Sequence, residues 1–216
     1  MLLSRDLAAV AMSCVMLSCA AAGLDDADQD DGDSIGLFPG KGYGGYDGVH
    51  TFTVPVAAPL ANATWELDPA DGTTTSITPP SAYRGSPLRS WAGVTVRAAG
   101  SIEIAATADG QRLAALLEIT SYLPSEIEVG RQRYLTPVNA DTPDRVACVS
   151  CHGQADGHDA SPLNTMIWSD AELLSAVTTG VYSDTYRLAV QHSWHLTSDE
   201  TRGIVGYLRS LPLRDR

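Results

Sequence analysis

The spacing of hydrophobic and polar residues changes along the chain and divides it into segments. In residues 49–122 apolar and polar positions alternate; for example, Phe52 and Val54 alternate with Thr51 and Thr53. This period of two is typical of strands with one buried face. Asp109-Gly110 separates two such runs and predicts a hairpin turn. Several short strands with turn residues between them predict a β-sandwich over this segment.

After residue 124 the spacing becomes helical. A Ser or Thr stands three residues before a Glu at Ser125, Ser169 and Thr197, and this pattern marks the start of a helix. The last helix is expected to end at Pro212, because proline cannot continue a helical hydrogen-bond ladder. We therefore predict an α-helical domain over residues 125–216.

The first 48 residues contain little that could form a core. Residues 1–18 have Arg5 followed by an apolar stretch of the length found in export signals, too short to span a bilayer. Met16-Leu17-Ser18-Cys19 resembles the lipobox of bacterial lipoproteins, which implies acylation of Cys19; the alternative is an ordinary signal cleaved within residues 20–23. Either version predicts export. Residues 19–48 are rich in Asp and Gly and predict a flexible tether.

One short motif carries candidate chemistry. Cys148-Val149-Ser150-Cys151-His152 has the C-x-x-C-H spacing at which two thiols reach the vinyl groups of one haem and the next residue offers an imidazole to the iron. A zinc site completed by His192 and His195 is the rival, but 40 residues separate Cys151 from His192, which is wrong for a zinc finger. The motif therefore predicts one covalent haem c.

Residues 125–216 resemble a small class I monohaem cytochrome c domain. The likeness rests on the motif, on Gly130 and Tyr134 in the first helix, and on the closing segment Gly206-Tyr207-Leu208-Arg209-Ser210-Leu211-Pro212. It implies an all-α domain in which His152 is the proximal iron ligand. In that family a glycine of the first helix lets the last helix cross closely, so Gly130 is expected at such a crossing.

Residues 49–122 resemble a bacterial immunoglobulin-like domain of the intimin and invasin type. Trp65-Glu66-Leu67-Asp68-Pro69 and residues 99–107 carry this likeness, and the segment has no cysteine pair. The predicted fold class is thus a multi-domain chain, with an all-β immunoglobulin-like sandwich at 49–122 followed by an all-α cytochrome c domain at 125–216.

The sequence departs from the cytochrome c pattern at the position of the sixth iron ligand. Members of the family usually supply a methionine from the loop before the last helix, but Met166, the only methionine after the leader, precedes the helix that starts at Ser169. The expected loop, residues 180–196, contains His192 and His195 instead. We expect His192 to bind the iron opposite His152, with His195 and Met166 as alternatives. Replacing a thioether by an imidazole is expected to lower the reduction potential.

The resemblance implies an electron carrier rather than an enzyme. We expect a lipid-anchored cytochrome at the periplasmic or cell-surface side of a bacterial membrane, with a redox partner protein and no small-molecule substrate. The chain shows no acid–base pair or activated nucleophile, and its net charge of −12 argues against a nucleic-acid partner. The alternatives are a gas sensor or haem enzyme with an open iron site, and a surface interaction protein with a structural haem.

Overall fold

The computed structural model describes residues 36–137, 146–153, 159–181, 187–188 and 192–214. All of them belong to one compact unit, Ile35–Arg216. Among the described residues, helices account for 29% and strands for 33%, so neither class of element dominates this unit.

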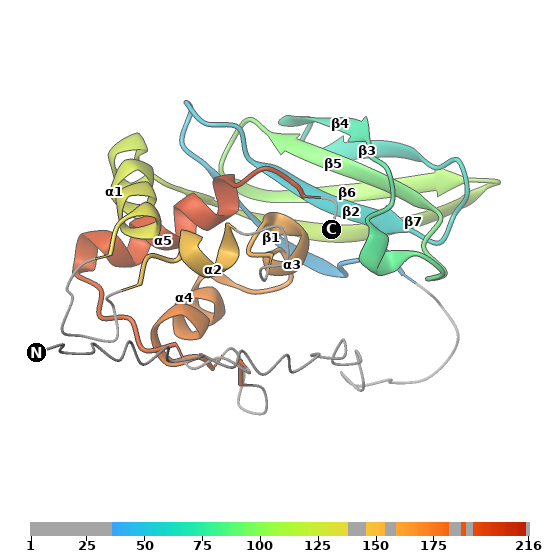
Figure 1. Cartoon of the computed structure of the whole chain (residues 1–216). Helices are drawn as coiled ribbons and strands as arrows, with labels where there is room; N and C mark the ends of the chain where they lie inside the picture. The colour runs from blue at the N-terminus through green and yellow to red at the C-terminus, as the bar shows by residue number, and fades with distance from the viewer. Residues whose placement is uncertain (1–35, 138–145, 154–158, 182–186, 189–191, 215–216) are drawn as a thin grey trace, which may run out of the picture. The chain divides into compact units, whose positions relative to one another are not determined.

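The strands of the described part form two sheets (Figure 1). One sheet has the order β1-β7-β6-β3, made of Lys41–Tyr46, Gln111–Ser121, Gly100–Ala108 and Thr64–Asp68. The other has the order β2-β5-β4, made of Thr53–Ala58, Ser90–Val96 and Gly72–Ser76. Apart from the parallel pair of β1 and β7, neighbouring strands are antiparallel. The strand orders β7-β6-β3 and β2-β5-β4 correspond to the GFC and BED sheets of an immunoglobulin sandwich.

The period-two pattern predicted buried positions of β2 and β6 correctly. Val54 in β2 and Ile104 in β6 are at most 2% exposed and lie in one hydrophobic core. In β2 the alternate positions Pro55 and Ala57 are buried as well, so this strand has no polar face. The predicted hairpin is confirmed as well. Asp109 and Gly110 both have positive φ, at 49° and 77°, as a two-residue turn between β6 and β7 requires.

The prediction of a tether over residues 19–48 is wrong for its last part. Within that segment, Phe38 forms an isolated bridge to Ala57 of β2, and β1 pairs with β7 in the β1-β7-β6-β3 sheet. Glycine-rich composition suggested a linker, but a Cβ at Gly44 would lie 2.6 Å from Val54 and 2.9 Å from Ile119. Glycine is needed in this strand because the backbone lies directly on the core and leaves no space for a side chain. Residues 19–35 of the predicted tether lie outside the described residues.

The helices of the described part are α1 (Pro124–Leu135), α2 (Val149–His152), α3 (Pro162–Thr165), α4 (Asp170–Thr179) and α5 (Ser198–Ser210), with a 3-10 turn at Ser81–Tyr83. The predicted capping boxes at Ser169 and Thr197 are confirmed. The one at Ser125 is wrong, because α1 begins at Pro124 and Glu126 accepts the Leu123 N–H at 2.8 Å.

The predicted all-α domain is also wrong, and with it the predicted fold class. The described helices do not enclose a core of their own: Ile127, Met166 and Ile204 belong to the same hydrophobic cluster as strand residues such as Phe52 and Leu117. A backbone hydrogen bond of 2.8 Å from the Tyr43 N–H in β1 to the Met166 carbonyl joins the two parts. Helical periodicity shows that one face is apolar, but it does not show whether a helix or a sheet covers that face.

The helix crossing expected at Gly130 is confirmed. A Cβ on Gly130 in α1 would lie 1.9 Å from the carbonyl oxygen of Gly203 in α5, so the two backbones touch there. Next to the crossing, the rings of Tyr134 and Tyr207 have centroids 5.2 Å apart. Only glycine permits this approach, because any side chain at the crossing would overlap the opposite backbone.

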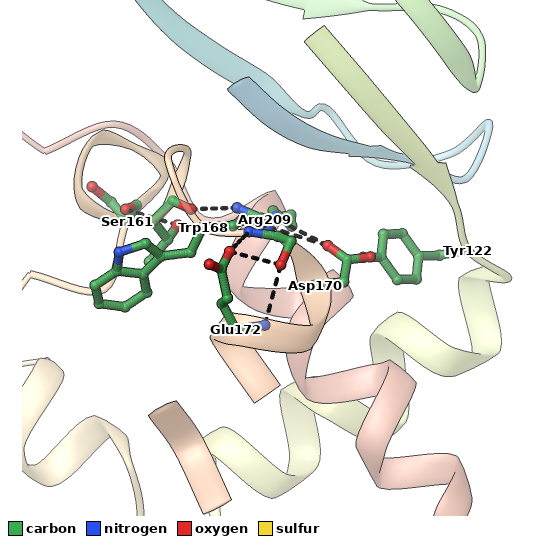
Figure 2. A network of polar contacts seen from close by, with 8 residues as sticks. Tyr122, Ser161, Trp168, Asp170, Glu172 and Arg209 are labelled. Atoms are coloured by element: carbon green, nitrogen blue, oxygen red, sulfur yellow. Dashed lines mark hydrogen bonds and ion pairs between the residues drawn. The ribbon is translucent and has the colours of Figure 1, made fainter. Parts of the chain in front are cut away.

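A buried arginine connects α5 to the turn between α3 and α4 (Figure 2). Arg209 is 2% exposed and donates to the carbonyls of Thr165, at 2.5 Å, and of Trp168. It also lies 3.1 Å from Asp170, whose other oxygen accepts the Tyr122 hydroxyl at 2.6 Å. Burial, followed by the Asp170 charge, raises the pKa of Tyr122 well above its usual range, so Tyr122 stays a neutral donor. Sequence analysis gave Arg209 no such role.

Candidate haem-binding site

The C-x-x-C-H motif forms a single helical turn. Cys148 is the N-cap of α2 with helical dihedral angles, and its carbonyl accepts the His152 N–H at 3.0 Å. Residues three and four positions apart in a helix lie on the same side. Cys148, Cys151 and His152 therefore share one face of this turn. Cys148 is half-buried and packs against the hydrophobic core, whereas Cys151 is exposed.

The structure brings His152 and His192 together from distant parts of the sequence. Their ring centroids are 6.2 Å apart, with 36° between the ring planes. A metal–nitrogen bond of about 2.0–2.1 Å and an imidazole radius of about 1.1 Å put two rings on opposite sides of a metal about 6.3 Å apart, centroid to centroid. The separation of the two predicted ligands therefore agrees with the distance between two imidazoles bound to one metal.

Gly180 makes room for the backbone of His192. It ends α4 in the left-handed conformation, with φ of 71°, and its carbonyl accepts the Leu188 N–H at 2.7 Å. A Cβ at Gly180 would lie 3.2 Å from the His192 backbone nitrogen. Glycine is therefore required here for two reasons, the backbone conformation and the close approach of the segment that carries His192.

The two alternative ligands have other surroundings. Met166 is fully buried in the core shared with the strands, and its backbone carbonyl accepts the Tyr43 N–H. His195 is exposed at its position two residues before Thr197, the N-cap of α5, and its carbonyl lies 3.4 Å from the Arg133 guanidinium. Burial among apolar side chains favours a packing role for Met166.

Arg214 is a site residue that sequence reasoning missed. Its guanidinium donates to the backbone carbonyl of His152 at 3.0 Å, at the end of α2, where carbonyls lack partners within the helix. A cation is favourable at that end of a helix. Leu213, one residue earlier, lies 3.8 Å from the position of a Cβ on Gly93 in β5. The carboxy-terminal segment thus connects the C-x-x-C-H turn, residues 148–152, to the β2-β5-β4 sheet.

Other predicted site residues are only partly described. Cys19, the predicted lipidation site, lies outside the described residues. So do Arg145 and Tyr186, two of three residues that the sequence offers as partners for the haem propionates. The third, Arg187, is exposed beside an isolated bridge to Val181. In the described ranges no three His, Cys, Asp or Glu side chains gather as a metal centre would require. A haem iron takes only its axial ligands from the protein and needs no such group.

None of the described helices has the length and hydropathy needed to cross a bilayer. No family model, curated protein or solved structure matches the chain.

Proposed function

We propose that this protein binds one covalent haem c through Cys148 and Cys151 and carries single electrons, with His152 and His192 as the axial iron ligands. The observation that carries the proposal is the 6.2 Å separation of the two imidazoles beside a helical turn that has both thiols and His152 on one face. When bound, the haem supplies an iron that gains or loses one electron without a bond being formed or broken in a substrate.

The roles of the chain's own residues follow from this arrangement. The two thiols would hold the group covalently, and the imidazoles of His152 and His192 would bind its iron. Arg214, at the carbonyl of His152, orients the C-x-x-C-H turn. Two nitrogen ligands favour a lower reduction potential than a His/Met pair.

The location of the protein is part of the proposal. An export signal at residues 1–18 and acylation of Cys19 would hold the protein at a bacterial membrane, facing the periplasm or the cell surface. Haem attachment to c-type cytochromes takes place outside the bacterial cytoplasm, which agrees with export. The proposed likeness to class I cytochromes c is confined to two features, the C-x-x-C-H motif and the crossing of α1 and α5.

A comparison of cysteine variants tests haem attachment. The full chain, exported from a bacterium with haem-attachment machinery, is expected to keep its haem on a denaturing gel and to show the sharp absorption bands of reduced haem c. The double variant Cys148→Ser/Cys151→Ser should lose this covalent haem. Cys19→Ser is the matched control, because it should leave the membrane fraction yet keep the haem. Intact thiols or bound zinc in the mass spectrum of the native protein would refute the proposal.

Substitution of His192 tests the ligand set. Imidazoles can also lie 6.2 Å apart in a direct ring contact, so spectroscopy has to decide. His192→Ala is expected to convert the ferric protein from low spin to high spin and to let the reduced protein bind carbon monoxide. His195→Ala is the control and should stay low spin. The reverse result would assign the ligand to His195, and rapid carbon monoxide binding by the unmodified protein would favour a gas sensor or haem enzyme.

A further inference from the structure

Arg133, in the last turn of α1, is buried against the segment that follows His192. The residue is only 4% exposed. Its guanidinium carbon lies 5.5 Å from the centre of the Trp194 ring, and one of its N–H groups points to the His195 carbonyl at 3.4 Å. Its Nε is 3.7 Å from the Glu200 carboxylate in the first turn of α5. The buried Arg133 cation thus contacts three residues that follow His192 within eight positions.

These contacts suit an arginine better than any other cation. A planar guanidinium can lie over an aromatic ring and donate hydrogen bonds at its edge at the same time, whereas a lysine ammonium is a compact point charge. The Arg133 side chain therefore restrains two residues next to His192 on the carboxy-terminal side. The C-terminal end of α4 also lies close to His192, because a Cβ on Gly180 would be 3.2 Å from the His192 backbone nitrogen.

We propose that Arg133 is the positioning residue that keeps His192 on the haem iron. The inference rests on the proposed function, since it requires a haem bound by His152 and His192. Arg133 does not touch the reacting atoms; it acts through Trp194 and the His195 carbonyl. Its removal leaves the segment less restrained, and the share of molecules with an open iron site rises. Affinity for an added ligand increases in proportion to that share.

The test compares two arginines of the same helix in the haem-loaded protein. Arg131 is exposed and pairs with Glu128 at 2.7 Å, two residues from Arg133, which makes Arg131→Ala a matched control. We expect Arg133→Ala to raise the high-spin fraction and to tighten cyanide binding to the ferric protein about tenfold. Saturating imidazole should return the variant to low spin. Arg133→Lys should fall between Arg133→Ala and the unmodified protein, and Arg131→Ala should match the unmodified protein.

The outcomes separate this inference from the proposed function. If His192→Ala opens the iron site but Arg133→Ala leaves cyanide affinity unchanged, Arg133 is not a positioning residue and the haem proposal stands. If His192→Ala has no effect on the spectrum, the ligand assignment itself fails. Should Arg133→Ala not fold, Trp194→Leu removes the half-buried stacking partner instead. Unchanged cyanide affinity in that variant would overturn the inference, and tighter binding would support it.

Discussion

Replacing Gly130 by alanine is expected to lower the free energy of unfolding by about 3 kcal/mol, at the upper end of the cost of overpacking a core. The added methyl would lie 1.9 Å from the Gly203 carbonyl oxygen, which is backbone and cannot rotate away, so α1 and α5 must separate. Alanine's higher helix propensity offsets only about 1 kcal/mol of this cost. For a chain of this size the loss corresponds to a decrease in Tm of about 6 to 12 °C.

Thermal unfolding of the purified variant, followed by circular dichroism, measures this effect. Gly40→Ala is the matched control, because a Cβ at Gly40 meets no atom within 4 Å and its φ is not positive. The control should unfold within about 0.5 kcal/mol of the unmodified protein. Equal Tm values for the two variants would mean that α1 and α5 do not cross at Gly130.

Replacing Arg209 by methionine is expected to destabilise the protein by about 3–5 kcal/mol, the cost of removing one partner from a buried charge pair. The substitution leaves the Asp170 carboxylate without its cation and the carbonyls of Thr165 and Trp168 without their donor. Methionine has a similar length and fills part of the space, so the loss reports mainly on the polar contacts. Urea unfolding of the variant measures it.

The exposed pair of Arg112 and Glu103 provides the control for this experiment. These side chains lie 2.6 Å apart, but both are about half exposed. Exposed pairs contribute about 0 to 1 kcal/mol, so Arg112→Met should shift the urea midpoint only slightly. If the two arginine variants lost the same stability, the network of Figure 2 would contribute no more than a surface ion pair does.

Because the helices and the β-sandwich share one core, the sandwich also contacts helices near the candidate site. Leu163 of α3 packs with Ala57 and Trp91 of the sandwich, and Arg209 lies 5.9 Å from the Tyr43 ring of β1. The sandwich therefore packs against α3 and α5. Deleting residues 49–122 would remove these contacts, so such a deletion is expected to disturb the helices as well. Substitutions of exposed strand residues, such as Leu116, are the better test of an interaction surface.

Features that depend on a few neighbouring residues could be predicted from the sequence alone. The capping boxes at Ser169 and Thr197 and the Asp109-Gly110 turn are local, because their hydrogen bonds join residues at most four positions apart. The C-x-x-C-H motif belongs to the same class, since a single helical turn brings its two cysteines and its histidine to one face. The Gly130 crossing was predicted from the resemblance.

Only the tertiary structure decided which surfaces meet. An apolar helix face has no preference between a sheet and another helix, so the periodicity of residues 125–216 did not show that these helices share the core of the sandwich. Likewise, some of the glycines that suggested a tether belong to β1. There the facing side chains leave no space for a Cβ. The rings of His192 and His152 lie 6.2 Å apart although 39 residues separate them, and such a contact depends on packing between residues far apart in the sequence.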